Sequence, residues 1–404
     1  MDLLTVRLYQ VSEMKPYIHA TLASTVAWAG NIYDLLIITY VYSYIEKTFG
    51  ISYTLVSLLF SLGLLGRVVG GTLFGRLADK YGRKPILMLT TLGYSLFHGI
   101  MAFSPDLPVL FVSRTLEGIF MGGEWTAGTI VAYESAPVSI RGILTGIVQS
   151  GYGIGYAFTG LTYLFFSSTM SQDWRLFLAT GAFPILLVPY MKLKVPESRA
   201  SFIKTVRVRY RDYSNLILKS TMAMSGMFIA YFSVFGNYPT FAIKLINMTP
   251  SELGLTLLVS NLFLAFSFIL FGRLADRVNI RKLIYGALVT LSLSLIFTVP
   301  GFIQVGSLTS IISTVIYASS CGFWPLIPLL LAHSVPTEIR GLLSGMSYNI
   351  GGLMGGITEV LTGISMEYLG VLGMAKVIDV LNILAFITVF ISVISWPRAS
   401  IQNQ

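Results

Sequence analysis

The sequence contains few charged residues, one cysteine and three histidines. Charged residues make up 11% of its 404 positions, against roughly 25% in a typical soluble domain, while 54% of the positions are apolar. So few charges cannot cover a water-soluble protein of this length, which places most of the chain in a lipid bilayer. The single cysteine, Cys321, excludes a disulfide scaffold, and with so few histidines the sequence offers no zinc-binding pattern. We therefore expect neither a bound metal nor another cofactor.

The chain does contain twelve apolar runs, each long enough to cross a membrane as a helix. A helical span takes about 20 residues, and continuous rather than alternating apolar residues favour helices over barrel strands. The first run lacks a cleavage site of small residues, so we expect it to be retained. The sequence therefore predicts an all-α membrane protein with twelve transmembrane helices. The runs fall at roughly 18–45, 53–75, 85–103, 109–133, 141–167, 174–192, 216–242, 252–272, 282–300, 305–332, 341–363 and 371–396.

The basic residues are concentrated on one side of the predicted membrane. With a cytoplasmic N-terminus, 21 of the 27 Lys and Arg residues fall on the cytoplasmic side and two fall within spans. By the positive-inside rule this predicts a protein of the cell membrane with both termini in the cytoplasm. The net charge of +9 thus reflects membrane orientation, and it does not indicate nucleic-acid binding. The outer side keeps four bases: Lys47, Arg175, Lys244 and Lys376.

Two short segments occur twice, about half the chain apart. Residues 75–84 read GRLADKYGRK and residues 272–282 read GRLADRVNIRK, while 135–142 read SAPVSIRG and 334–341 read SVPTEIRG. This spacing predicts a duplicated six-helix unit, with both copies in one orientation and a cavity between them. The predicted parts are an N-terminal six-helix bundle at 1–192, a cytoplasmic linker at 193–215 and a C-terminal six-helix bundle at 216–404.

The segment GRLADKYGRK resembles the signature of the major facilitator superfamily, and it lies between the second and third spans, as it does in that family. The run Gly122-Gly123-Glu124-Trp125 and the run Tyr348-Asn349-Ile350-Gly351-Gly352 are most similar to proton symporters of sialate, lactate and other metabolites. Pro196-Glu197-Ser198-Arg199 is similar to sugar porters. The resemblance covers essentially the whole chain and implies a major facilitator fold that transports by alternating access.

The resemblance also implies latches between helices at the cytoplasmic face, with simple solvated turns as the alternative. The second repeat departs from the family pattern at 278–280, and His333 stands where the first repeat has Glu134. The fifth span lacks the proline of the antiporter signature, which favours symport or uniport. The expected latch residues are Gly75, Asp79, Arg83, Glu134, Arg141, Asp276 and Arg340.

Charged residues inside the predicted spans are costly and by default mark a pathway or a paired site. Because the acids outnumber the bases, at least one carboxylate lacks a fixed partner and must be able to take up a proton. This is what a proton-coupled carrier requires. The bases are Arg67 and Arg114, and the acids are Asp34, Glu117, Glu124 and Glu359.

Depth along the helices predicts which of these groups meet. At about 1.5 Å per residue, Arg67 and Glu124 lie about 21 and 22 Å from the outer ends of their spans, so they can pair. Asp34 and Arg114 lie about 16 and 8 Å deep, a gap that an arginine can bridge, and Glu117 shares the helix face of Arg114. In the sugar and organic-acid porters that the chain resembles, the equivalent acid and arginine form the protonation switch. We therefore expect Asp34 to carry the proton, with Arg114, Glu117 and Glu124 taking part in coupling. A structural latch for the first pair and a static salt bridge for the second are the alternatives.

Glu359 lies near the outer end of the eleventh span, where we expect an interfacial or structural acid. Lys376 is one candidate partner for it. Lys376 and Asp379 also have the spacing of a local pair on one helix face.

Polar and aromatic residues at central depth are expected to line the cavity and bind substrate. An amide within a span can equally hold two helices together, so each assignment has this alternative. Arg67 and Arg114 would suit a substrate carboxylate if no internal acid occupies them. The expected lining residues are Asn31, Arg67, Gln149, Tyr152, Asn237, Tyr238, Asn261, Trp324, Tyr348 and Asn349.

These features predict a proton-coupled symporter of a small organic acid, a monocarboxylate or related metabolite, with a proton-coupled sugar porter as the alternative. An enzyme would need a cluster of nucleophiles or metal ligands, and the three histidines lie far apart in the sequence. A sensor would carry a long soluble extension. The expected partners are the small polar metabolite, protons and the lipid bilayer, with no nucleic acid, and we expect a monomer.

Overall fold

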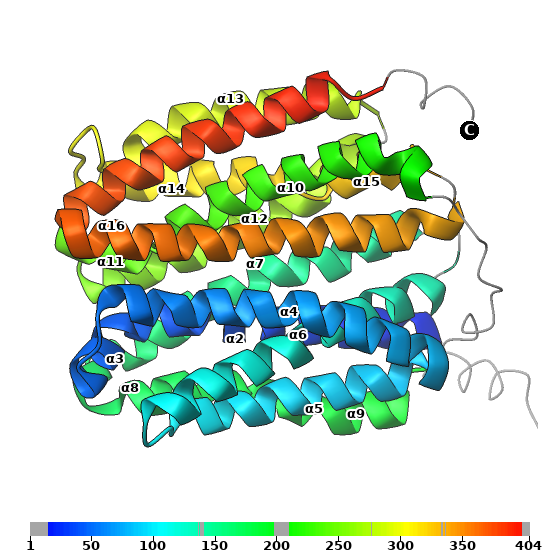
Figure 1. The fold of residues 1–404 in the computed structure, drawn as a ribbon, viewed down its shortest axis with the longest axis horizontal. Coiled ribbons are helices and arrows are strands. Elements are labelled where there is room, and N and C mark those ends of the chain that lie inside the picture. The colour runs from blue at the N-terminus through cyan, green and yellow to red at the C-terminus, as the bar shows by residue number, and fades with distance from the viewer. Residues whose placement is uncertain are drawn as a thin grey trace, which may run out of the picture.

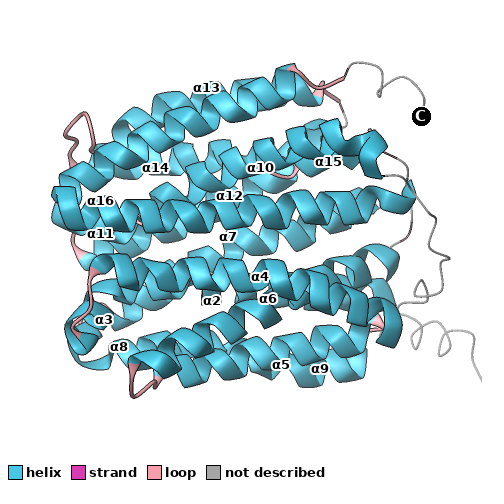
Figure 2. Cartoon of the chain, in the orientation of Figure 1, coloured by secondary structure: helices cyan, strands magenta, loops and turns pink. Residues whose placement is uncertain are grey.

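The computed structural model describes residues 15–135, 137, 141–197, 210–275, 277–332, 334–335 and 337–397. Within these ranges the chain forms helices and short connections, with no strand (Figure 2). The predicted all-α fold is thus confirmed.

Six of the predicted spans belong to the first half of the chain, and two of these are interrupted by a short 3-10 helix. Ser52 caps the second span, because its side chain accepts a hydrogen bond from the Leu55 N–H at 3.4 Å. The elements are α2 (Pro16–Ile37), η1 (Ile38–Val41), α3 (Tyr42–Phe49), α4 (Tyr53–Tyr81), α5 (Arg83–Ala102), α6 (Leu107–Ser135), α7 (Arg141–Phe166), α8 (Met170–Ala179), η3 (Thr180–Leu186) and α9 (Leu187–Lys194).

The second half repeats this pattern. Its last helix is continuous except at Gly370, whose φ of 70° lies in the left-handed region that glycine adopts without strain, so the eleventh and twelfth runs form one broken helix. The elements are η5 (Tyr210–Tyr213), α10 (Ser214–Phe235), α11 (Tyr238–Lys244), α12 (Pro250–Ala275), α13 (Ile280–Thr298), α14 (Ser307–Ser320), η6 (Cys321–Phe323), α15 (Leu326–Ala332) and α16 (Thr337–Ile394).

All twelve predicted runs therefore correspond to helices. Nine stretches of the described chain are long and apolar enough to cross a membrane, and the stretch in α16 contains two of the runs. Helix α6, which carries three buried charged residues, and the glycine-rich α7 are not among these nine. Together these helices make the chain a multi-pass membrane protein.

The helices form two groups, α2–α9 and α10–α16, which lie against each other in Figure 1. Close approach between the groups depends on small residues. The Cβ of an alanine at Gly153 of α7 would lie 2.5 Å from the Asn261 carbonyl oxygen of α12. The boundaries predicted for the two bundles and the linker stay a prediction, and residues 198–209 of that linker lie outside the described residues.

The two groups are closed against each other at one end of the molecule. We call this end, where α3 meets α4 and α11 meets α12, the outer end, following the predicted orientation. Tyr53 and Thr240 share a hydrogen bond of 2.8 Å, and Thr54 donates to Glu367 at 2.6 Å. Further along, Ser61 donates to the Gly356 carbonyl oxygen at 2.5 Å. The side-chain hydrogen bonds found between the halves thus gather toward the outer end.

Candidate functional site

Helices α4 and α6 cross closely enough to enclose an arginine. A Cβ at Gly63 would lie 2.9 Å from Nε of Arg114, and a Cβ at Gly66 would lie 2.7 Å from the Thr115 carbonyl oxygen. Glycines here let the two backbones approach, and Arg114 is fully buried between them. Its Nε donates to the Leu59 carbonyl oxygen at 3.0 Å.

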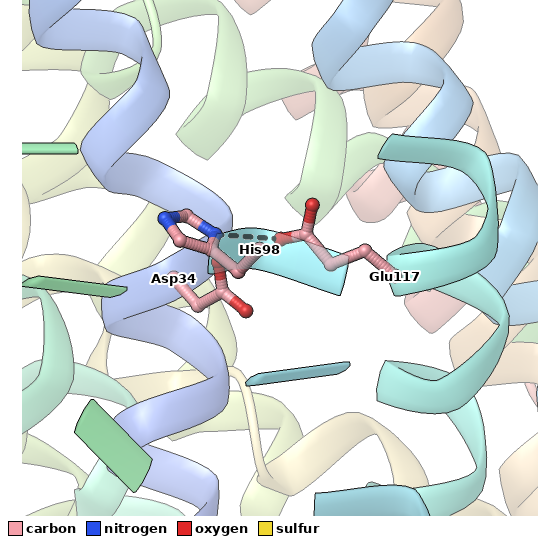
Figure 3. Close-up of side chains that lie close together, drawn as sticks. All are labelled: Asp34, His98 and Glu117. Atoms are coloured by element: carbon pink, nitrogen blue, oxygen red, sulfur yellow. Dashed lines mark hydrogen bonds and ion pairs between the residues drawn. The ribbon is translucent and has the colours of Figure 1, made fainter. Parts of the chain in front are cut away.

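Arg114 belongs to a cluster of four buried charged or titratable side chains in the first half. Glu117 Oε1 accepts a hydrogen bond from Arg114 Nη1 at 2.8 Å and lies 3.0 Å from His98 Nδ1. The same His98 nitrogen contacts the carboxylate of Asp34. Asp34 comes from α2, His98 from α5 and Glu117 from α6 (Figure 3). Arg114 also comes from α6. All four side chains are fully buried.

The geometry of His98 requires a proton between it and the acids. Its Nε2 lies 2.7 Å from the Leu178 carbonyl oxygen, which only accepts, so Nε2 carries a hydrogen. Its Nδ1 faces carboxylate oxygens of both Asp34 and Glu117. A bare nitrogen lone pair would be repelled by them, so a proton lies either on Nδ1 or on one of the carboxyl groups. With this proton the four-residue cluster is neutral, and without it the cluster has one net negative charge.

The expected pairing of Asp34 with Arg114 is therefore wrong in this structure. Arg114 is occupied by Glu117 and by two backbone carbonyl oxygens, while Asp34 contacts His98. His98 lies far from the other histidines along the chain, so it was not predicted as a site residue. A polar residue within an apolar span was the signal available for it.

Metal binding is a second chemical use of such a cluster. Potential ligand atoms of Asp34, His98 and Glu117 lie within 4.8 Å of one another. Glu117, however, already has the guanidinium of Arg114 as its cation, and Nδ1 of His98 faces both acids. The contacts favour a proton over a metal ion at this cluster.

The expected ion pair between Arg67 and Glu124 is also not found among the described residues. Glu124 Oε2 instead accepts from Asn31 Nδ2 at 2.7 Å, and Asn31 also donates to the Met121 carbonyl oxygen at 2.9 Å. The guanidinium of Arg67 lies over the ring of Trp28, 5.1 Å from its centroid. Asn31 thus ties α2 to α6 in this conformation, and a direct role in substrate binding stays a prediction.

Arg67 borders a small cavity between the two halves. The cavity has a volume of about 10 Å³, enough for one water molecule at most, so it has no room for a substrate in this conformation. Its lining residues come from α4, α10 and α16, and they are Leu64, Arg67, Phe228, Tyr348, Asn349 and Gly352.

Two of the lining residues, Phe228 and Tyr348, belong to a cluster of aromatic side chains. Trp125 stacks on Tyr348 with ring centroids 4.6 Å apart and planes 12° apart, and Phe228 meets Tyr348 edge-on at 5.0 Å. The ring centroids of Trp324 and Tyr152 are 4.9 Å apart. We call Trp28, Trp125, Tyr152, Phe228, Trp324 and Tyr348 the aromatic cage.

Several hydrogen-bond donors in the cage are unused. The indole nitrogens of Trp28 and Trp324 are buried and have no hydrogen-bond partner in the described part of the chain. The buried hydroxyl groups of Tyr152 and Tyr348 have only the poorly aligned neighbours Tyr231 and Gln149. Unused buried donors are unfavourable, and a bound acceptor would satisfy them. A guanidinium, unused donors and flat apolar walls together suit a carboxylate attached to an apolar or ring-shaped body.

Other predicted lining residues contact protein groups in this conformation. Asn261 accepts from Tyr231 at 2.7 Å, and Tyr238 shares hydrogen bonds with Ser310 and Thr314. Gln149 is half-buried on α7, and Asn349 lines the cavity beside Arg67. Substrate binding by any of these residues stays a prediction.

Glu359 is a buried, hydrogen-bonded acid, which agrees with the expected structural role, and Lys376 forms no ion pair with it among the described residues. The side chain of Glu359 is fully buried, and its two carboxylate oxygens lie 3.3 and 3.2 Å from Nδ2 of Asn237. Lys376 is exposed, and no ion pair joins it to Glu359 or Asp379 within the described ranges.

The predicted latches are only partly described. Glu197 Oε1 accepts hydrogen bonds from the N–H groups of Arg83 and Lys84, at 2.9 and 3.3 Å, at the start of α5. Glu197, which belongs to the sugar-porter-like run, thus caps the start of α5. Gly75 lies within α4, but the latch pairs stay predictions because their remaining members lie outside the described side chains. These are Asp79, Glu134, Arg141, Asp276 and Arg340.

Comparison with known proteins agrees with this architecture. A sialic acid transporter, NanX, of Escherichia coli (strain K12) is 28% identical over 365 residues, which cover 85% of this chain and 87% of that protein. A probable 4-methylmuconolactone transporter of Cupriavidus pinatubonensis is 25% identical over 361 residues, covering 85% and 82% of the two chains. The solved structure of a D-xylose–proton symporter has the same fold, with a TM-score of 0.76 at 17% identity, covering 93% of this chain and 97% of the other. The family model of the major facilitator superfamily matches residues 22–358. The chain is therefore a transporter that belongs to the major facilitator superfamily.

Proposed function

We propose that this protein is a proton-coupled symporter that binds the carboxylate of a small organic acid at Arg67. The observation that supports this most directly is that the two internal arginines differ in ion pairing. Arg114 is neutralised by Glu117 at 2.8 Å. Arg67 lies over the face of Trp28 and forms no ion pair among the described residues, although Glu124 acts on it at longer range. A buried guanidinium without a carboxylate is a ready site for an anionic ligand.

The aromatic cage adds a preference for the body of the substrate. Phe228 and Tyr348 line the cavity at Arg67, and Trp125 and Trp324 stack on Tyr348, so a substrate with a ring or a flat apolar face would pack against these rings. Two relatives are described as transporters of sialic acid and of 4-methylmuconolactone. A substrate that is an organic acid agrees with the first of these names, since sialic acid carries a carboxylate at neutral pH.

The proton would be carried by the cluster of Asp34, His98, Arg114 and Glu117. The cluster and the anion site share two helices: Asp34 lies one turn from Asn31 on α2, and Glu117 lies two turns from Glu124 on α6. The Asn31–Glu124 hydrogen bond lies between them. Movement of α2 against α6 would therefore affect both sites, which is how binding of the anion and of the proton would be coupled.

Uptake into proteoliposomes under an imposed pH gradient tests this function. We expect accumulation of labelled ring-containing carboxylates, with little uptake of neutral sugars of similar size. Loss of a buried, hydrogen-bonded charge partner costs about 2–5 kcal/mol, so Arg67→Gln should raise KM for the acid by roughly 30- to 5,000-fold.

Arg175→Gln is the matched control, because this arginine also lies over a tryptophan, Trp174 at 4.5 Å, but at the outer end. The control should leave KM for the acid near the wild-type value. A different result would identify a sugar porter. In that case the wild type takes up neutral sugars but no acids, and the Arg67→Gln variant still takes up the sugars.

A further inference from the structure

A further buried acid, Glu359, lies in the second half of the molecule. It is separate from the cluster of Asp34, His98, Arg114 and Glu117, which we call the proton cluster. Glu359 of α16 packs against the break between α10 and α11. A Cβ at Gly236 would lie 2.0 Å from Oε1 of Glu359, so only glycine leaves room for the carboxyl group there. Asn237, the residue that follows, directs its Nδ2 at both carboxyl oxygens and at Thr362 Oγ1, 3.2 Å away.

Glu359 also lies where the two halves meet. One turn before it, the Gly356 carbonyl oxygen accepts from Ser61 of α4 at 2.5 Å. One turn after it, a Cβ at Gly363 would lie 3.0 Å from the Ser57 Cβ of α4. The carboxyl group is thus enclosed by the same contacts that close the outer end.

The titratable groups of neighbouring helices that interact electrostatically with Glu359 carry no positive charge that could neutralise it. They are phenols: Tyr42 of α3, Tyr53 of α4 and Tyr156 of α7. Arg114 is a base that acts on Tyr42, and it is already paired with Glu117. Within the described ranges no Lys, Arg or His forms an ion pair with Glu359.

A fully buried carboxylate with one amide donor and no cation is strongly unfavourable. The carboxyl group of Glu359 must therefore be neutral while the outer end is closed. When the halves separate there, Tyr42, Tyr53 and Glu359 face water, and the carboxyl group can release its proton. Closing the outer end then takes up one proton, and a lower pH on that side favours the closed form.

We propose that Glu359 is a second proton-binding site, which must be protonated before the outer ends of the two halves can close. This goes beyond the proposed function, because it concerns the outer gate alone and holds whichever substrate binds at Arg67.

Distance measurements without substrate test this proposal and remain informative if the proposed function is wrong. Thr48 of α3 and Lys244 of α11 are exposed at the outer ends of the two halves. Spin labels on Thr48→Cys and Lys244→Cys, in the full chain with Cys321→Ala, would report the outer gate in lipid nanodiscs by electron–electron double resonance.

In the wild type we expect the short-distance population to fall as pH rises, with the closed-to-open ratio changing by up to about tenfold per pH unit for one linked proton. Glu359→Gln should stay closed across the whole pH range. Glu359→Asp, which keeps a titratable group, should restore a pH response. Asp379→Asn is the matched control, since Asp379 is another buried acid of α16, and it should respond to pH as the wild type does.

Two results would overturn the proposal. One is a wild-type gate whose distances do not change with pH. The other is a Glu359→Gln gate with the full wild-type response, which would assign the pH dependence to the Asp34–His98 cluster.

Discussion

Replacement of His98 by glutamine should uncouple transport from the proton gradient without abolishing transport. In the wild type, His98 Nε2 lies 2.7 Å from the Leu178 carbonyl oxygen. A glutamine amide nitrogen can take the place of Nε2 and keep this hydrogen bond. It cannot take up a proton where Nδ1 faces Asp34 and Glu117. The substitution thus removes the titrating group while it preserves the contact that holds it.

The expected size of the effect follows from the charges that remain. Arg114 neutralises Glu117 at 2.8 Å, so ionised Asp34 would be left as a buried charge without a partner. Breaking a buried pair in this way costs about 3–5 kcal/mol, which favours the protonated form of Asp34 by roughly 100- to 5,000-fold. Asp34 would then keep its proton throughout the transport cycle, and the cluster would stay neutral.

Two assays separate coupling from movement of the substrate. A pH difference of one unit can drive about tenfold accumulation in a one-proton symporter, since it supplies about 1.4 kcal/mol. The His98→Gln variant should reach no accumulation above equilibrium, while exchange of labelled for unlabelled substrate should continue. His19→Gln is the matched control. His19 forms a hydrogen bond of 2.7 Å with the Tyr190 hydroxyl group, and it does not belong to the cluster. Wild-type accumulation by His98→Gln would refute the assignment of the proton to this cluster.

Three further outcomes are expected. Asp34→Asn should also lose accumulation driven by the pH gradient and keep exchange, and a variant with both activities intact would exclude Asp34 as a proton carrier. Gly70→Ala should lower the thermal unfolding temperature of the purified protein by several degrees, because the Cβ would lie 1.7 Å from the Ile119 carbonyl oxygen and overpacking costs about 1–3 kcal/mol. Gly146→Ala, with nothing within 4 Å of the new Cβ, should leave that temperature unchanged. Trp125→Ala, which removes the ring stacked on Tyr348, should raise KM more for ring-containing acids than for short linear ones, and equal effects on both would argue against the aromatic cage.

The fold could be predicted from the sequence because its main determinants can be read along the chain. The bilayer thickness sets the length of each apolar run, and the distribution of basic residues indicates the orientation. Apolar runs located every span, and the repeated segments near 75 and 272 indicated the duplication. Interruptions of the spans were not predicted. The 3-10 stretch at Thr180–Leu186 arises around Pro184, and the break after Phe235 places Asn237 against Glu359, which depends on contacts between distant helices.

The site was predicted at the level of residue type but not of pairing. Depth along a helix fixes how far a side chain lies from the membrane surface, but it leaves the direction around the helix axis undetermined. Arg67 and Glu124 have similar depths, yet Glu124 is taken by Asn31 and Arg67 faces Trp28. Asp34 and Arg114 likewise share a cluster, but His98 from α5 lies at Asp34, where the arginine was expected.

The buried acids of the two halves have different surroundings, and this difference determines which movement controls the protonation of each acid. The proton of the first half is shared by His98 with Asp34 and Glu117, beside a fixed cation, so the proton cluster can lose it without leaving every acid unpaired. Glu359 in the second half has one amide donor and no cation, so it can lose its proton only when the contacts around Ser61 and Gly356 open. Protonation of Glu359 is therefore tied to the position of the gate, whereas protonation of the cluster is tied to movement of α2 against α6.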